Sequence, residues 1–369
     1  MIIHLTKGAV FGNVFNHGRY PFPFFGLSVS DSRSILRRSR FIPATSLRVG
    51  TRSKGDLGFF CLRGCIMTIP EINILFPTDA RCRALLQRLR WPEGVMCPRC
   101  KDTRVSVLQD YGRFECVGCE YQFTVTSGTI FHDSHLPLTK WFLAVLLLVE
   151  ARKGISAKQL QRTIGMGYKT AWYLCHRIRK AMAGAHKPML DGTIEMDETY
   201  VGGKQRGLGH GWRTRKTKQV VIGIRQRSGD VRFFHAEDAK TGTLAKYIKE
   251  NISTDVDVIV TDDLPAYQKA VGKAKHETVN HTAKEYVRGD IHTNTVESAF
   301  SLLKRAVIGT YHQLSIKHLQ RYLNEFSYRF NRREALDMFE QTVARMAGIE
   351  AMPYSKLVEQ NAFTPFVRP

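Results

Sequence analysis

The chain has 369 residues, and 55 Lys and Arg against 33 Asp and Glu give a formal net charge of +22. This basic excess indicates a polyanionic partner, nucleic acid before a membrane surface. A hydrophobic content of 43% argues against a largely disordered chain. The longest apolar run, Trp141–Val149, is too short to span a bilayer, so we expect no membrane partner.

Residues 1–66 differ in composition from the rest of the chain. They carry ten Lys or Arg and two acidic residues, without clear helical or strand periodicity. This basic leader fits either an Arg- and Ser-rich transit peptide or non-native sequence ahead of a true start at Met67. We favour the second interpretation because a well-patterned segment begins at Met67. The leader contributes +8 of the +22, so the remainder still carries +14.

Residues 67–130 are predicted to form a helix followed by a small zinc ribbon. Thr78–Arg90 has an apolar stripe, and Thr78 is a candidate N-cap. Two CxxC pairs follow with fifteen residues between them, the spacing of a tetrahedral zinc site on a β-hairpin: Cys97, Cys100, Cys116 and Cys119. Four ordinary buried cysteines are the alternative. A closed four-thiolate site has no open coordination position, so we expect structural Zn²⁺ in a reducing compartment.

Residues 131–188 are predicted to be helical and to resemble a helix-turn-helix in outline. An apolar helix over 138–153 precedes a short helix over 157–164, a Gly-containing turn and a longer helix over 169–183. The last helix could enter a DNA major groove, and a plain helical hairpin between two domains is the alternative. Its candidate DNA contacts are Lys169, Arg177 and Lys180.

Residues 189–335 change to strand patterns and are predicted to form a mixed α/β domain. Ile194 and Met196 alternate with acidic residues in its first strand. An antiparallel meander and then α/β units follow, which predicts a sheet with helices on its faces. We expect residues 336–369 to be a C-terminal tail, helical to about Gly348 and poorly ordered beyond it.

Three carboxylates from different elements of this domain are candidate metal ligands and catalytic residues. Asp197 lies on the first strand, Asp262 ends a buried strand, and Glu297 lies near the start of a helix. If the first and fourth strands are adjacent, the two aspartates meet and the helix can bring Glu297 over them. Carboxylates so placed repel one another without cations. The set would suit two Mg²⁺ (or Mn²⁺) ions about 4 Å apart, for in-line attack at a phosphodiester.

Neighbouring residues leave several roles open. Glu297 could be the partner of Asn294 in a capping box, and Asp262 could instead cap the next helix. Strand alternation puts Glu195 on the Asp197 face and Glu198 on the other, so Glu195 is the better candidate to sense the ions. On the helix of Glu297, Lys304 shares its face and is predicted to contact DNA phosphate, with Arg305 offset. Two histidines could lie near the site, although a lone histidine is more often structural: His281 and His292.

Five segments of the chain resemble the ISXO2-like DDE transposase domain: IEMDETYVGGK, VIVTDDLPAY, TVNH, HTNTVESAFSLLKR and RYLNEFSYRFNRR. The four-cysteine ribbon resembles the amino-terminal zinc ribbon of the same insertion-sequence transposases, and the resemblance covers roughly residues 70–335. It implies a ribonuclease-H-like catalytic domain in a multidomain α+β chain, and divalent-metal cleavage and transfer of DNA strands. It also implies binding to the terminal inverted repeats and to target DNA, with Asp197, Asp262 and Glu297 as the metal-binding triad.

We therefore expect a DNA transposase that acts as a homodimer or larger assembly when two element ends are paired. The expected location is the cytoplasm of a bacterial cell, associated with the nucleoid. Two alternatives remain open: a catalytically silent zinc-ribbon DNA-binding regulator, and a nuclease of the same fold. The intact acidic set argues against the first, and only a comparison of substrates separates the second from a transposase.

Overall fold

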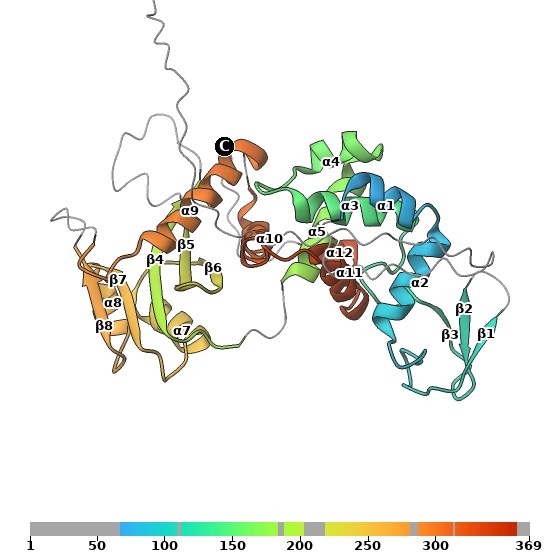
Figure 1. The fold of residues 1–369 in the computed structure, drawn as a ribbon, viewed down its shortest axis with the longest axis horizontal. Helices are drawn as coiled ribbons and strands as arrows, with labels where there is room; N and C mark the ends of the chain where they lie inside the picture. Colours follow the sequence, from blue (N-terminus) through green and yellow to red (C-terminus); the bar gives the residue numbers. More distant parts are fainter. Residues whose placement is uncertain are drawn as a thin grey trace, which may run out of the picture. The chain divides into compact units, whose positions relative to one another are not determined.

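The computed structural model describes residues 67–108, 112–183, 188–202, 218–280, 287–312 and 314–359 (Figure 1). The leader predicted over residues 1–66 lies outside the described residues. No helix in the described ranges is both long and apolar enough to cross a membrane.

Two helices and a three-stranded sheet begin the described chain. Helix α2, Asp79–Arg90, is capped by Thr78 as predicted. Helix α1, Ile69–Leu75, was not predicted, although the capping box of Thr68 and Glu71 is readable as Thr-x-x-Glu. The sheet is antiparallel in the order β1-β2-β3, with these bounds: β1 Val105–Leu108, β2 Arg113–Cys116 and β3 Gln122–Thr124.

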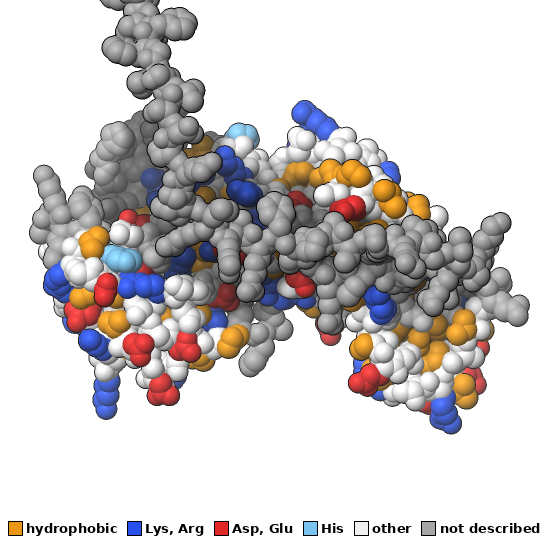
Figure 2. Space-filling model, in the orientation of Figure 1, with side chains coloured by type: hydrophobic (Ala, Val, Ile, Leu, Met, Phe, Trp, Pro, Cys, Tyr) orange, Lys and Arg blue, Asp and Glu red, His pale blue; other side chains and the backbone are white. Residues whose placement is uncertain are grey.

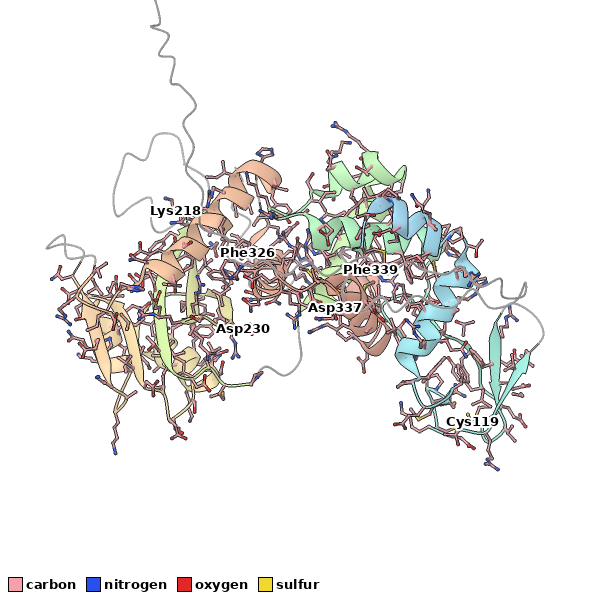
Figure 3. The ribbon with its side chains drawn as sticks, in the orientation of Figure 1. Cys119, Lys218, Asp230, Phe326, Asp337 and Phe339 are labelled. Atoms are coloured by element: carbon pink, nitrogen blue, oxygen red, sulfur yellow. The ribbon has the colours of Figure 1, made fainter. Side chains whose placement is uncertain are left out.

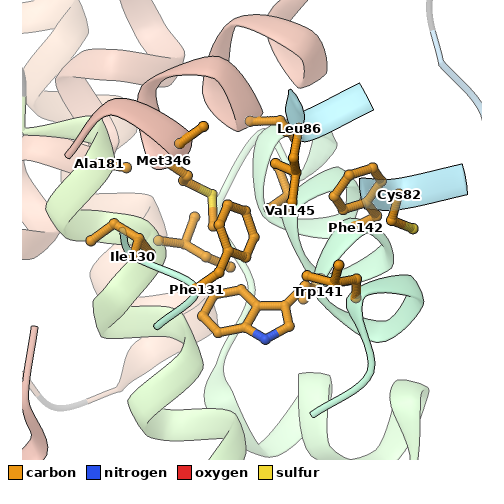
Figure 4. Close-up of a cluster of buried hydrophobic side chains, with 14 of the residues drawn as sticks. Cys82, Leu86, Ile130, Phe131, Trp141, Phe142, Val145, Ala181 and Met346 are labelled. Atoms are coloured by element: carbon orange, nitrogen blue, oxygen red, sulfur yellow. The ribbon is translucent and has the colours of Figure 1, made fainter. Parts of the chain in front are cut away.

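Three helices follow in the arrangement that the sequence predicts, with shifted ends: α3 Leu138–Glu150, α4 Ala157–Ile164 and α5 Tyr168–Met182. Ser156 caps α4, and Gly165 ends it in the left-handed conformation, with φ of 68°. Apolar side chains from α2, α3 and α5 share one core, in which Leu86, Trp141 and Phe142 are almost completely buried (Figure 4).

The C-terminal segment belongs to this helical core. Helix α11, Met338–Gly348, places Phe339 and Met346 in the core with α2 and α3. A further helix, α12, spans Tyr354–Val358 and buries Leu357 completely. The expectation of poor order beyond Gly348 is therefore wrong for residues 349–359. The sequence pattern predicted a helix up to about Gly348, but it did not indicate that this helix packs against α2 and α3.

A five-stranded mixed sheet forms the centre of the remaining chain. The strand order is β6-β5-β4-β7-β8, with β4 antiparallel to β5, β5 antiparallel to β6, and parallel pairing of β4 with β7 and β7 with β8. The first and fourth strands are thus adjacent, as the sequence argument required. Their bounds are β4 Thr193–Val201, β5 Gln219–Gln226, β6 Val231–Ala236, β7 Val258–Asp262 and β8 His276–Val279.

Helices cover both faces of this sheet. Alternate residues of β4 point to opposite faces, and each face has its own apolar cluster. Helices α7, Thr241–Asn251, and α8, Pro265–Ala270, pack on the face of Ile194 and Met196. Helices α9, Asn294–Ala306, and α10, Leu319–Asn331, pack on the face of Val201 (Figure 1).

A buried ion pair joins α10 to α5. Arg179 Nε lies 2.5 Å from Glu325 Oε2, and both side chains are 1% exposed. Glu325 Oε1 also accepts from Tyr311 and pairs with Arg329. The Glu325 carboxylate is therefore compensated by two guanidinium groups, and Arg329 also donates to the Ala151 carbonyl. Helix α10 therefore contacts both the sheet, through Phe326, and the helical core that contains Phe339 (Figure 3).

Candidate functional site

The four ribbon cysteines lie together, as predicted. The Sγ atoms of Cys97 and Cys119 are 3.7 Å apart, and those of Cys100 and Cys116 are 3.4 Å apart. All four sulfur atoms lie within 4.8 Å of one another (Cys119 is labelled in Figure 3). Sulfurs at ~2.3 Å around one tetrahedral Zn²⁺ would be about 3.8 Å apart, so this donor set fits structural zinc.

The backbone forms the same turn after each CxxC pair. The residue after the second cysteine is left-handed in both, with φ of 67° at Lys101 and 51° at Glu120. Each donates its N–H to the carbonyl of the first cysteine, Cys97 or Cys116. Burial disfavours the Cys97 thiolate, but the N–H groups of Cys100 and Arg99 stabilise it and lower its pKa to about 7. Such turns present two thiolates to one cation.

The two predicted aspartates meet where β4 and β7 run side by side. The parallel register ends at the pair Glu195 and Val260, and Asp197 and Asp262 each follow two residues later. One carboxylate oxygen from each aspartate and one from Glu198 all lie within 4.8 Å of one another. The sequence thus placed both aspartates correctly, and the tertiary structure adds Glu198 as a third member of the acidic cluster.

Without a bound cation, the ionised form of Asp197 is electrostatically unfavourable in the acidic cluster. Burial raises the pKa of Asp197 to about 8, and the charges of Glu198, Asp262 and Glu297 act in the same direction. A hydrogen bond of 2.7 Å from the Glu198 N–H offsets only part of this effect. A divalent cation would remove the penalty by neutralising the cluster.

Glu198 reaches the cluster from the opposite face of β4. Its carboxylate accepts a 2.9 Å hydrogen bond from the hydroxyl of Tyr267 on α8. Burial and the negative charges of Glu198 and Asp197 hold the pKa of Tyr267 well above its usual range, so it remains a donor. Strand alternation correctly put Glu198 and Asp197 on opposite faces of β4. It gave no indication that Tyr267 of α8 would bind the Glu198 carboxylate at the acidic cluster.

Glu297 lies on the first turn of α9, on the solvent-exposed side. Its charge acts on Asp197, but it is not among the three residues of the tight acidic cluster. Thr293 Oγ1 donates to Glu297 Oε1 over 2.8 Å. The N-cap of α9 is Thr293 rather than Asn294, so the capping box that we considered with Asn294 does not form. The role of Glu297 as a metal ligand stays a prediction.

Glu195 has a different position from the one we expected. It shares the Asp197 face, as alternation predicts, but its fully buried carboxylate contacts the N-terminus of α9 rather than the acidic cluster. His292 Nδ1 lies 3.3 Å from Glu195 Oε1 and belongs to the same group of contacts. His281 lies outside the described residues.

The predicted DNA contacts divide into exposed and internal residues. Lys169, Lys304 and Arg305 are exposed. Arg177 is 3% exposed, lies over the Trp141 ring and donates to the His132 carbonyl. This guanidinium lies inside the protein, against the expectation of an exposed DNA contact, because α5 is buried around most of its circumference. Lys180 is half-buried and donates to the carbonyls of Glu350 and Ala351.

A four-thiolate ribbon ahead of a mixed α/β domain with clustered carboxylates defines a zinc-ribbon protein with a candidate metal-dependent site. Residues 189–331 match the ISXO2-like transposase domain, and residues 77–122 match the transposase zinc-ribbon domain. The chain is also similar to an "uncharacterized protein in transposable element ISH50" from Halobacterium salinarum. That match is 30% identical over 272 residues, covering 69% of this chain and 91% of the relative. The chain belongs to the ISXO2-like family of insertion-sequence transposases.

Proposed function

We propose that this transposase uses its acidic cluster to cleave DNA at the ends of an insertion sequence and to join the freed 3′-hydroxyl to target DNA. The observation that supports this most strongly is the convergence of Asp197, Glu198 and Asp262, where the end of β7 lies beside the middle of β4. Three carboxylates in such proximity are expensive to hold unless a cation compensates them.

The topology of the sheet supports a ribonuclease-H-like catalytic domain. Numbered from β4 along the chain, its strands lie in the order 3-2-1-4-5, and the second strand is antiparallel to both of its neighbours. The acidic cluster forms around the first and fourth of these strands. This placement is the one that the resemblance to DDE transposases leads us to expect for the first two acidic residues.

The donor set suits hard divalent cations. Asp197, Glu198 and Asp262 would hold Mg²⁺ through carboxylate oxygens, the ligands that Mg²⁺ prefers, and Glu297 would complete the set from α9. Bound Mg²⁺ would supply Lewis-acid activation of the attacking hydroxyl and stabilise the leaving oxygen. The chain itself orients the carboxylates: the Glu198 N–H holds Asp197 Oδ1, and Tyr267 holds Glu198.

Two exposed basic regions would contact DNA. The 33 residues from Ala151 to Ala183 contain no Asp or Glu, and α4 with the start of α5 exposes Lys158, Arg162, Tyr168 and Lys169. Lys158 Nζ lies 5.8 Å from the centre of the Tyr168 ring, so side chains of the two helices meet. A basic surface with an aromatic residue suits contact with a nucleic acid backbone.

The second basic region is near the acidic cluster. Lys304 and Arg305 are exposed on the last turn of α9, and blue side chains gather around α9 in the view of Figure 2. Lys304 lies two turns, or about 10 Å, beyond Glu297 on the same face of the helix. Lys304 would contact a phosphate beside the scissile one.

The pairing of two element ends would require at least two copies of the chain.

Cleavage and strand transfer with purified protein, Mg²⁺ and DNA carrying the terminal repeats would test this function. We expect Asp197→Asn to abolish both reactions while repeat binding persists, and Asp255→Asn, an exposed acid outside the cluster, to retain them. Binding without either reaction in the wild-type protein would favour a silent regulator. Cleavage without strand transfer would favour a nuclease. Full activity of Asp197→Asn would refute the site.

A further inference from the structure

The first turn of α9 is capped by a residue a hundred positions away in the chain. The N–H groups of Thr295 and Val296 have no intrahelical partners, and the side chain of the N-cap residue Thr293 does not cap them. Both N–H groups donate instead to Glu195 Oε2, over 2.9 and 3.0 Å. The Thr295 hydroxyl donates to the same oxygen over 2.6 Å.

The other oxygen of Glu195 binds a second element. Arg227, directly after β5, donates from Nε to Glu195 Oε1 over 3.1 Å. The same guanidinium donates to the carbonyls of Asp290 and His292, just before α9. Glu195 thus joins the central strand to the helix start, and Arg227 holds the segment that leads into that start. The carboxylate is 0% exposed, so water does not compete for these bonds.

A second contact fixes α9 on the other side of Glu297. Phe300, one turn beyond Glu297, packs over Gly223, which pairs with Asp197 on the neighbouring strand. A Cβ atom on Gly223 would come within 2.6 Å of the Phe300 ring, so the absence of a side chain there lets the helix approach the sheet. Glu297 lies between the Glu195 contact and the Phe300 contact.

We infer that Glu195 is a positioning residue that sets where Glu297 lies relative to the acidic cluster, by fixing the start of α9 to β4. Glu195 and Asp197 are two residues apart on one strand, so the strand sets a fixed spacing of about 7 Å between the anchor and the first acidic ligand. Glu297 follows the anchored Thr295 and Val296 directly on a rigid helix. This inference rests on the proposed function, because it assigns Glu297 to the metal site.

The anchor itself can be tested without metal or DNA. In Glu195→Gln, an NH₂ group replaces one of the two accepting oxygens. It would face donors, either the N–H groups of the helix start or Arg227, so one of these two sets of hydrogen bonds is lost. We expect the Thr295 and Val296 amides to exchange hydrogen at least about tenfold faster than in the wild type. Glu250→Gln on α7, an exposed control, should not change their exchange. Unchanged exchange in Glu195→Gln would overturn the anchor.

The positioning role is tested by Mn²⁺ binding to the zinc-loaded full chain. We expect Mn²⁺ affinity to fall about tenfold in Glu195→Gln, to fall similarly in Glu297→Gln, and to fall no further in the double variant. An unchanged affinity in Glu195→Gln, or additive losses in the double variant, would overturn the positioning role even if the anchor is real.

A second variant keeps the test decisive if Glu195→Gln does not fold. Arg227→Gln alters a side chain that is 25% exposed, and we expect it to raise amide exchange at Thr295 and to weaken Mn²⁺ binding in the same direction. Normal exchange and normal affinity in Arg227→Gln would overturn the inference. Wild-type protein that neither binds Mn²⁺ nor cleaves DNA would refute the proposed function. The amide exchange of Thr295 and Val296 tests their contact with Glu195 independently of that function.

Discussion

Replacing Asp197 by Asn should make the metal-free protein more stable while it destroys catalysis. The folded-state pKa of Asp197 is raised from 3.8 to about 8 by burial and by the neighbouring carboxylates. At pH 7 the unfolded chain carries this carboxylate ionised, whereas the folded chain must bind a proton or bear the repulsion. The folded state therefore loses stability as the pH rises from about 4 to 8.

The size of this effect follows from the pKa. One pKa unit corresponds to ~1.4 kcal/mol, so the interval between 3.8 and an assay pH of ~7 amounts to roughly 4 kcal/mol. Asn is isosteric with the protonated acid, so Asp197→Asn should recover most of that free energy. For a domain of this size, the melting temperature would rise by roughly 10 °C.

Differential scanning calorimetry in Mg²⁺-free buffer, without a chelator that would strip zinc from the ribbon, would measure the change. The gain of Asp197→Asn should shrink toward pH 4, where the wild-type carboxyl is protonated in both states. It should also shrink as Mg²⁺ is added, because only the wild type is strongly stabilised by the cation. A melting temperature at or below the wild-type value at pH 7 would refute the electrostatic argument.

Three further substitutions test other parts of the structure. Cys116→Ser should lower the zinc-to-protein ratio and unfold the ribbon, since a domain this small depends on metal for stability. Glu325→Gln leaves the buried charge of Arg179 without its partner and should lower the free energy of unfolding in urea by roughly 3–5 kcal/mol. Gly223→Ala pushes against Phe300 and should cost about 1–3 kcal/mol, with a larger relative loss of DNA cleavage.

Each of these has a matched comparison. Cys82→Ser alters a buried thiol outside the zinc cluster, and a zinc ratio as low as in Cys116→Ser would contradict the ligand assignment. Glu340→Gln breaks the exposed pair with Arg88 and should cost less than about 1 kcal/mol; an equal loss would contradict the burial argument. Cleavage by Gly223→Ala should recover when Phe300→Leu relieves the contact, and failure to recover would contradict it.

Local patterns identified most elements of this protein. Period-2 alternation found the strand of Ile194 and Met196, and the cap Thr78 located the start of α2, because capping is decided within one turn. The CxxC spacing found the zinc ribbon for the same reason, since each pair is a local turn. The capping box of Thr68 and Glu71 is an equally local signal, and it marks the start of α1, a helix that was not predicted.

The sequence alone also indicated that Asp197, within the first strand of the domain, and Asp262, at the end of the fourth, would meet if those two strands were adjacent. What it could not decide was how side chains from distant elements meet. Glu198 joins the acidic cluster and accepts a hydrogen bond from Tyr267 on α8, Arg177 turns inward beside Trp141, and α11 completes the helical core.

Glu195 shows the physical reason for this limit. Alternation put it on the same face as Asp197, and that much was correct. Its partners are N–H groups of α9 and a guanidinium after β5, and no local pattern records a hydrogen bond across a hundred residues. The sequence determined which acids lie on which strand, and the tertiary structure decided which of them joins the acidic cluster and which holds the helix above it.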